Sequence, residues 1–362
     1  MACPAKPLPA EDLDHVLAQT RGLWDELRGQ RIFITGGTGF FGTWLLESFA
    51  RVNDALGLKA SAAVLTRDPA AFAKKAPHLA NRPDLEFIRG DVRNFIFPAG
   101  QFSHVIHAAT EASAKLNAEA PQEMLDTIIA GTRRVLDFAG QCGVRKLLLT
   151  SSGAVYGRQP PELAHVSEDY SGAPDPLSPG SAYGEGKRIA EHLCAVHALR
   201  HGYEVKIARC FAFVGPHLPL DAHFAVGNFI RDGLAGGPIR VNGDGTPVRS
   251  YLYAADLAAW LWTILFRGQS GRAYNVGSEE ALSIAQTAEL VAKAINPALK
   301  VEIARAAVKG RPAERYVPST RRAVTELGLR EWTPFELGVR RNVFWQQQNG
   351  QRNPASINES SF

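Results

Sequence analysis

A tyrosine and a lysine four residues apart are the side chains of this 362-residue chain best suited to proton transfer. Tyr183 and Lys187 lie in the segment Ser-Ala-Tyr-Gly-Glu-Gly-Lys, and residues with this spacing share one face of a helix. A nearby ammonium lowers the pKa of a phenol, so Tyr183 could exchange a proton with a substrate hydroxyl. The same spacing is common on solvated helix faces, so the pair alone does not establish a site.

A strand, a glycine turn and a helix follow one another near the N-terminus. The β-branched and aromatic run 31–35 breaks into Gly36, Gly39 and Gly42, and a helical pattern follows over 43–50. These glycines let backbone N–H groups approach a pyrophosphate, whose charge is favoured at the positive end of the helix dipole. A glycine triplet alone is often only a turn, but the strand before it and the helix after it favour a nucleotide site.

A third candidate segment ends a strand that reads as buried. The run 146–151 is rich in leucine and finishes in the hydroxyls of Ser151 and Ser152. In an open parallel sheet, ligands bind at the carboxyl ends of the strands, so these serines should face the same cleft as the glycine turn. A helix cap or a turn would explain them equally well if they stood alone.

Together these segments resemble the extended short-chain dehydrogenase/reductase superfamily, and within it the nucleotide-sugar epimerase/dehydratase branch. The similarity runs from about Arg31 to about Trp345. It is carried by TGGTGFFG at 35–42, HAA at 107–109, SSGAVYG at 151–157 and YGEGK at 183–187. The resemblance implies an α/β fold, a Rossmann-type doubly wound parallel sheet with a smaller C-terminal substrate-binding lobe.

The resemblance assigns catalytic roles to three side chains. In the family, the Tyr and Lys of a YxxxK motif are the catalytic acid/base and its activator, which correspond to Tyr183 and Lys187. The family's catalytic Ser or Thr lies four residues before the Tyr of its VYG segment. Counting back from Tyr156 gives Ser152.

It also implies which residues lie against a nicotinamide dinucleotide. Asp91 would lie near the adenine, and Ala108 and Ala109 would form backbone walls around the cofactor. The expected cofactor-binding residues are Gly36, Gly39, Phe40, Phe41, Gly42, Arg67, Asp91, Val92, Ala108, Ala109, Tyr183 and Lys187. His107 is expected to be a satisfied core histidine.

The choice between NAD and NADP is read at the end of the second strand. There an acidic side chain accepts hydrogen bonds from the adenosine ribose, whereas an arginine accommodates a 2′-phosphate. Thr66 stands where many NAD-dependent relatives have Asp, and the following Arg67 favours NADP. Asp68 favours NAD. The sequence therefore predicts NAD or NADP and leaves the type open.

The substrate implied by the resemblance is a nucleotide-diphosphate sugar. The segment 243–256 is similar to the one in which nucleotide-sugar enzymes present an arginine to the diphosphate, which corresponds to Arg249. A guanidinium suits this role because it donates two parallel hydrogen bonds to phosphate oxygens. Arg311 is similar to a second family arginine near the nucleotide, and Asn228 is a further candidate for contact with it.

The chain departs from the family at the positions that eliminate water. Nucleotide-sugar 4,6-dehydratases carry Asp-Glu after the catalytic Thr, and decarboxylating relatives carry Glu at the second position, but this chain has Gly153 and Ala154. Two family asparagines are also replaced, by Ala212 and Ile128. These departures favour an NDP-sugar 4-epimerase that works through a 4-keto-sugar. Alternatives are an NADPH-dependent ketosugar reductase, a 4,6-dehydratase with differently placed acids, and a non-catalytic dinucleotide sensor.

The organisation of the chain follows from its patterns. Strand-like runs at 31–35, 61–66, 85–89, 104–108, 146–151 and 204–208 alternate with helical ones, which predicts βαβ units. We expect a helical extension over 1–29, with its helix at 11–28. We expect the Rossmann domain to take 30–210 and about 248–268, the substrate lobe 211–247 and 269–345, and a disordered tail 346–362.

Composition and charge limit the partners and the cellular compartment that we expect. A net charge of +4 is small for this length and argues against nucleic acid as a partner. Without a run of about 18 apolar residues, a secretory signal or cysteines at metal-ligand spacing, we expect a cytoplasmic protein with no membrane span and no metal site. Family members often form homodimers, so the resemblance implies a homodimer. The residues themselves give no independent evidence for it.

Overall fold

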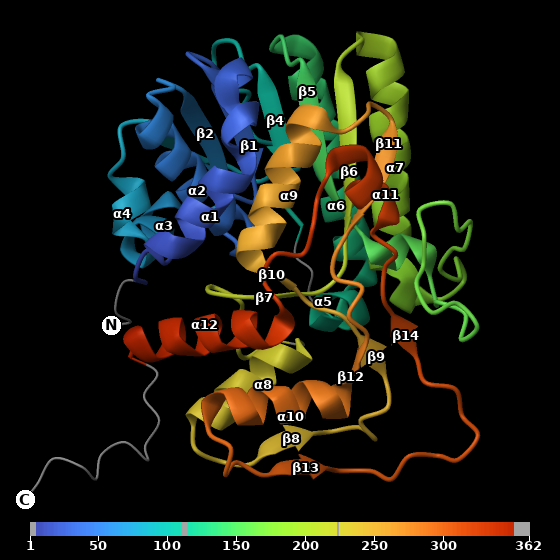
Figure 1. Cartoon of the computed structure of the whole chain (residues 1–362). Coiled ribbons are helices and arrows are strands. Elements are labelled where there is room, and N and C mark those ends of the chain that lie inside the picture. Colours follow the sequence, from blue (N-terminus) through green and yellow to red (C-terminus); the bar gives the residue numbers. More distant parts are fainter. Residues whose placement is uncertain (1–4, 111–113, 223, 351–362) are drawn as a thin grey trace, which may run out of the picture.

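The computed structural model describes residues 5–110, 114–222 and 224–350. Within these ranges, a seven-stranded parallel sheet runs in the order β11–β6–β5–β4–β1–β2–β3 (Figure 1). Its strands are β1 Arg31–Thr35, β2 Ser61–Thr66, β3 Leu85–Arg89, β4 His104–His107, β5 Lys146–Ser152, β6 Glu204–Cys210 and β11 Arg272–Val276. The expected α/β fold is confirmed.

Helices cover both faces of the sheet because alternate residues of a strand point to opposite sides. On β1, Ile32 and Ile34 pack into one hydrophobic core and Phe33 packs into another. The first core holds α1 Ala10–Thr20, α2 Phe40–Leu56 and α9 Ala254–Arg267. The second holds α6 Pro121–Gln141 and α7 Ala182–His201. The sheet is therefore doubly wound, with short helices α3 Pro69–Lys75, α4 Pro77–Ala80 and α5 Ala114–Glu119 in its connections.

A smaller lobe lies at the carboxyl ends of the strands, where the chain leaves β6 (Figure 1). Its helices are α8 Ala225–Leu234, α10 Ile284–Ile295 and α12 Phe335–Gln348, whereas α11 Arg321–Leu327 lies beside β11 of the main sheet (Figure 1). Its short strands are β7 Phe213–Val214, β8 Ile239–Val241, β9 Val248–Arg249, β10 Leu252–Tyr253, β12 Leu282–Ser283, β13 Val301–Ile303 and β14 Arg315–Tyr316. The buried side chains of α8, α10 and α12 belong to the same hydrophobic cluster as α9, so the lobe is packed firmly onto the sheet.

Two expected boundaries need correction. β11 falls inside 269–345, the range expected for the lobe, yet it pairs in parallel with β6 and completes the main sheet. Disorder is not found at the start of the tail expected from 346, because α12 continues to Gln348 and the side chain of Gln346 is buried. The rest of that predicted tail, 351–362, lies outside the described residues. None of the helices in the described ranges combines the length and apolar character that crossing a bilayer requires.

The N-terminal extension is part of the core. Its predicted helix is α1 followed by a 3-10 helix, Arg21–Leu27. The ring of Trp24 lies 4.6 Å from that of Trp262 and 5.3 Å from that of Phe266, both on α9. Its indole Nε1 donates a hydrogen bond of 2.9 Å to the Thr20 hydroxyl.

Replacing Trp24, which is 0% exposed, by alanine should therefore lower the free energy of unfolding by about 3–5 kcal/mol. Phe344 on α12 is 62% exposed, and Phe344→Ala is the matched control, with an expected change within about 0.5 kcal/mol. Urea unfolding of the two variants measures both values. Equal effects would show that the extension does not stabilise the domain.

Candidate active site

The glycine turn between β1 and α2 lies against the end of β4. Gly36 has a φ of 73°, and a Cβ there would lie 2.4 Å from the carbonyl oxygen of Ala108. A Cβ on Gly42 would lie 2.2 Å from the Gly36 carbonyl oxygen. The opposing atoms belong to the backbone and cannot move aside, so both positions require glycine.

The N-terminus of α2 fits an anionic ligand. Its N-cap residue is Gly39, no side chain caps it, and its first turn carries no acidic residue. A Cβ on Gly39 would have only the Gly36 carbonyl oxygen, at 3.5 Å, within contact distance, so the space beside the turn is open. Uncapped N–H groups and the helix dipole favour a pyrophosphate there. These residues fit the expected dinucleotide.

Side chains around the turn hold its walls in place. The Ala109 N–H donates to the Thr35 hydroxyl at 3.2 Å, and that hydroxyl lies 2.8 Å from Nδ1 of His107. Nε2 of His107 lies 3.1 Å from the Thr132 hydroxyl, and burial lowers the pKa of His107 to about 3. His107 is therefore a satisfied core histidine, as expected.

The remaining expected cofactor residues lie along the same edge of the sheet. Phe40 and Phe41 open α2, and the ring of Phe41 lies 5.0 Å from that of Phe213 in the lobe. Arg67 follows β2 directly, while Asp91 and Val92 lie just beyond β3. The glycine turn after β1 thus lies between β5, which ends in Ser152, and the edge of the sheet formed by β2 and β3.

Ser152, Tyr183 and Lys187 come together as the sequence analysis expects. Ser152 is the last residue of β5, and Tyr183 and Lys187 lie in the first two turns of α7. The hydrogen bond of the Ser152 hydroxyl lowers the pKa of Tyr183. The Lys187 Nζ lies 5.8 Å from the centre of the Tyr183 ring.

The protonation of this pair differs from the expectation. Burial raises the pKa of Tyr183 to about 12 and lowers the pKa of Lys187 to about 8. The ammonium directs its hydrogen bonds to the Thr110 hydroxyl and the Thr150 carbonyl, each at 2.9 Å, and not to the phenol. The expectation that Lys187 lowers the pKa of Tyr183 is therefore wrong, because desolvation dominates.

Three residues that support the site were not identified from the sequence. The Thr110 hydroxyl accepts a hydrogen bond from Lys187. The one sequence signal for this role was its position directly after Ala109. Asn117 on α5 accepts a hydrogen bond of 2.9 Å from the backbone N–H of Tyr183 and donates one of 2.7 Å to the Gly180 carbonyl. It thereby fixes the start of α7. The third is Tyr316.

Tyr316 of β14 reaches Ser152 from the lobe. Burial raises its pKa, and the hydrogen bond of the Ser152 hydroxyl lowers it. Its ring lies 4.6 Å from that of Phe211. A Cβ on Gly153 would lie 2.7 Å from both the Tyr316 hydroxyl and the tip of the Phe211 ring. The position that carries an acid in 4,6-dehydratases is therefore occupied by these two rings.

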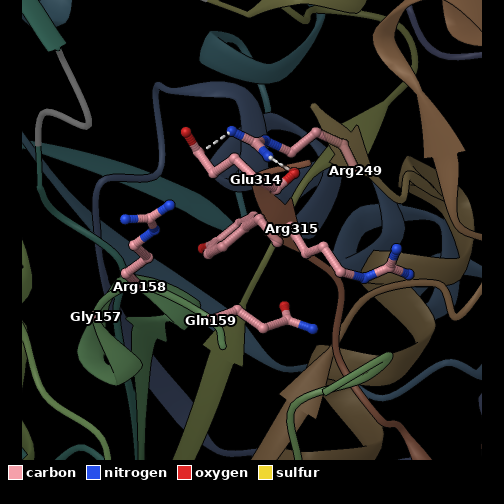
Figure 2. A pocket seen from close by; sticks show the side chains of 7 residues that line it. Gly157, Arg158, Gln159, Arg249, Glu314 and Arg315 are labelled. Carbon is pink, nitrogen blue, oxygen red and sulfur yellow. Dashed lines mark hydrogen bonds and ion pairs between the residues drawn. The ribbon is translucent and has the colours of Figure 1, made fainter. Parts of the chain in front are cut away.

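Tyr316 also lines a pocket of about 500 Å³ (Figure 2). The other lining residues are Gly157, Arg158, Gln159, Arg249, Glu314 and Arg315. The Arg249 guanidinium donates 2.6 Å and 3.0 Å hydrogen bonds to the Glu314 carboxylate and the Val248 carbonyl. The pocket thus carries three guanidinium groups and one carboxylate, which suits an anionic ligand.

The other two predicted substrate residues lie outside this pocket. Arg311 is exposed in the connection between β13 and β14. Asn228 is half-buried on α8, where its side-chain oxygen accepts a hydrogen bond of 3.2 Å from Arg231. The structure therefore brings Arg249 to the catalytic residues through Tyr316, but not Arg311 or Asn228.

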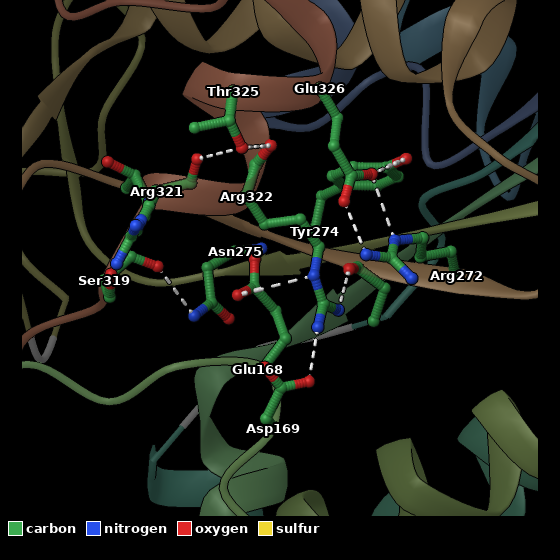
Figure 3. A network of polar contacts seen from close by, with 12 residues as sticks. Glu168, Asp169, Arg272, Tyr274, Asn275, Ser319, Arg321, Arg322, Thr325 and Glu326 are labelled. Carbon is green, nitrogen blue, oxygen red and sulfur yellow. Dashed lines mark hydrogen bonds and ion pairs between the residues drawn. The ribbon is translucent and has the colours of Figure 1, made fainter.

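A polar network behind the site fixes the segment after β5 (Figure 3). The Tyr156 hydroxyl donates a hydrogen bond of 2.7 Å to the side-chain oxygen of Asn275 on β11. The backbone N–H of Asn275 donates 2.8 Å to Glu168, and Arg322 of α11 donates 2.6 Å to Asp169. The loop that follows Ser152 is thus tied to β11 of the main sheet and to α11 beside it.

The lowered pKa of Lys187 predicts a pH-dependent stability. Between pH 8 and its ordinary value of 10.5, the folded protein loses this proton while the unfolded chain keeps it. Stability contributed by this group should therefore rise with pH through that window, by up to about 3 kcal/mol. Urea unfolding at the two ends should show this rise in the wild type relative to Lys187→Met. Parallel pH profiles would contradict it.

Comparisons with known proteins identify the family of this chain. The NAD dependent epimerase/dehydratase family model matches residues 32–277. UDP-glucuronic acid decarboxylase 6 of Arabidopsis thaliana is 32% identical over 75% of this chain and 76% of its own length. The Streptomyces venezuelae dTDP-glucose 4,6-dehydratase DesIV, solved with NAD, covers 90% of this chain and 99% of its own with a TM-score of 0.76 and 23% identity. Thermotoga maritima UDP-glucose 4-epimerase, solved with UDP-glucose, covers 88% and 99% with a TM-score of 0.74 and 22% identity. This chain belongs to the NAD dependent epimerase/dehydratase family.

Proposed function

We propose that the protein is a nucleotide-sugar 4-epimerase. The observation that carries the proposal is the combination of Ser152, Tyr183 and Lys187 with a neighbouring Gly153, over which the side chains of Phe211 and Tyr316 take the space that an acidic side chain would need. Oxidation and reduction at one sugar carbon need only the first three groups. Elimination of water needs a further acid and base.

The pocket beside Tyr316 supports a nucleotide-diphosphate sugar as substrate. Arg158, Arg249 and Arg315 come from three separate segments and line it together. Their guanidinium groups suit phosphate oxygens, and Tyr316 connects the pocket to Ser152. A sugar attached to a diphosphate held there would extend toward Tyr183.

The reaction then follows from the positions of the three groups. In its ionised form, Tyr183 takes the proton of the C4 hydroxyl, and Ser152 donates a hydrogen bond to the same oxygen. Burial favours the neutral phenol, and the positive charge of Lys187, 5.8 Å from the centre of the ring, favours the ionised form that this step requires. The bound nicotinamide dinucleotide supplies the acceptor and donor of the hydride. Rotation of the 4-keto-sugar, followed by return of the hydride to the other face of C4 and of the proton from Tyr183 to the oxygen, gives the C4 epimer.

A second candidate is an NADPH-dependent reductase of a nucleotide-linked ketosugar. The raised pKa of Tyr183 favours it, because a neutral phenol is ready to donate a proton to a ketone oxygen. Arg67 at the end of β2 also favours it. Both enzymes use the same three groups, so they differ only in whether the hydride returns to the substrate.

Decarboxylation and dehydration have less support. The curated relatives include UDP-glucuronic acid decarboxylases, but Ala154 stands at the position where decarboxylating relatives carry Glu. A 4,6-dehydratase would need acids from elsewhere in the pocket. A dinucleotide sensor without catalysis would have no need for Ser152, Tyr183 and Lys187 together.

Product analysis tests the proposal. The purified protein, supplied with each nicotinamide dinucleotide, is incubated with UDP-glucose, UDP-glucuronic acid or dTDP-glucose, and the products are identified by NMR. A C4 epimer formed without net change in reduced cofactor is the expected result. Stoichiometric consumption of NADPH with a ketosugar would identify the reductase, and a pentose or a 4-keto-6-deoxy sugar would overturn the proposal.

Removing the Tyr183 hydroxyl separates catalysis from binding. Tyr183→Phe should lower kcat by about 10²–10⁴-fold, because the proton can no longer be transferred, and should leave folding intact. Tyr203→Phe makes the same chemical change on the buried Tyr203 next to β6 and should retain activity. Steady-state rates of the two variants decide the matter. Unchanged turnover in Tyr183→Phe would contradict the proposed proton transfer by this hydroxyl.

A further inference from the structure

We propose that the protein selects the phosphorylated dinucleotide NADP(H) over NAD(H), with Arg67 as the residue that reads the 2′-phosphate. The inference concerns the adenosine end of the cofactor. It is therefore independent of the reaction performed at the sugar, and it separates this chain from the family's description as NAD dependent.

The end of β2 carries no free carboxylate for the ribose. β2 is the direct neighbour of β1, so the adenosine of a dinucleotide bound at the glycine turn lies at its carboxyl end. The last strand residue, Thr66, is 8% exposed and bears only a hydroxyl. An NAD site of this fold uses an acidic side chain here to accept hydrogen bonds from the ribose hydroxyls.

The nearby Asp68, which in the sequence favours NAD, has another role. It is the N-cap of α3, and its Oδ1 accepts a hydrogen bond of 2.9 Å from the backbone N–H of Ala71. Pro69 occupies the first turn of that helix, as is common after a capping residue. Asp68 thus uses one of its carboxylate oxygens to stabilise the start of α3.

The charge at this edge of the sheet is positive. Arg67 and Arg89 are both exposed, and neither guanidinium forms an ion pair with another described residue. In register, Arg89 lies opposite Thr66 on β3. Both arginines thus stand where the ribose of a bound dinucleotide would lie.

The carboxylate of Asp91, which lies near Arg67, is already paired. The hydrogen bond of Arg93 lowers the pKa of Asp91, and the charge of Arg67 lowers it further, so Arg67 and Asp91 are near each other. However, Asp91 is bound in bidentate fashion by Arg93, with Nε–Oδ1 and NH2–Oδ2 distances of 2.8 Å. Arg93 therefore neutralises the acid and leaves Arg67 free for a phosphate, to which a guanidinium donates charge-assisted hydrogen bonds.

Binding measurements without any sugar test the inference. We expect calorimetric titration of the wild-type protein to show NADPH binding at least about tenfold tighter than NADH, a factor typical of a hydrogen bond between charged groups. Adenosine 2′,5′-bisphosphate should compete better than 5′-AMP. Mass spectrometry of any dinucleotide released on denaturation should show NADP. Equal affinities, or NAD as the released cofactor, would overturn the proposal.

Two variants test whether Arg67 causes the selectivity for NADPH over NADH. Arg67→Ala changes an exposed side chain, so it should leave folding intact, weaken NADPH binding to the level of NADH and leave NADH binding unchanged. Arg240→Ala is the control, because Arg240 is likewise exposed but lies on β8 in the lobe. An equal loss for both dinucleotides in Arg67→Ala would refute a role in reading the phosphate. Since no substrate is needed, failure of the epimerase proposal would leave these results unaffected.

Discussion

The burial of one ammonium group is the constraint on which the catalytic site depends. Lys187 is 3% exposed, and its hydrogen bonds go to two neutral oxygens, those of Thr110 and Thr150. The nearest acid on the same helix, Glu191, is bound by Arg209 at 2.8 Å and by Ser151 at 2.5 Å. The charge of Lys187 therefore remains without a paired carboxylate. A buried cation held in this way lowers stability, and such groups are typical of functional sites.

Three separate parts of the fold converge on that group. The end of β5 supplies the Thr150 carbonyl, the segment after β4 supplies Thr110, and α7 supplies Lys187 itself. Asn117 fixes the first turn of α7, so Tyr183 keeps its position beside Ser152. From the other side, Tyr316 and Phe211 fill the space over Gly153. The result is a site equipped for proton and hydride transfer at one carbon, without a side chain at 153 or 154 to eliminate water.

Much of this arrangement could be predicted from local sequence patterns. Strands such as 31–35 and 61–66 are short, apolar and bounded by turns, so their limits agree with the structure. Residues that act across long stretches of chain gave no such signal. Asn117 and Tyr316 matter only because folding brings them to Tyr183 and Ser152. β11 was misassigned because its pairing with β6 is not encoded in its own five residues. The pKa of Tyr183 depends on burial, which spacing alone does not give.

The most direct test of the central claim follows the hydrogen at C4 of the sugar. A nucleotide sugar carrying deuterium at C4 is incubated with the protein and its cofactor in ordinary water, and the epimer is analysed by mass spectrometry and NMR. Hydride transfer within the site predicts that the epimer keeps its deuterium at C4. Replacement of that deuterium by solvent hydrogen would contradict the account, because it would mean that C4 loses a proton and not a hydride.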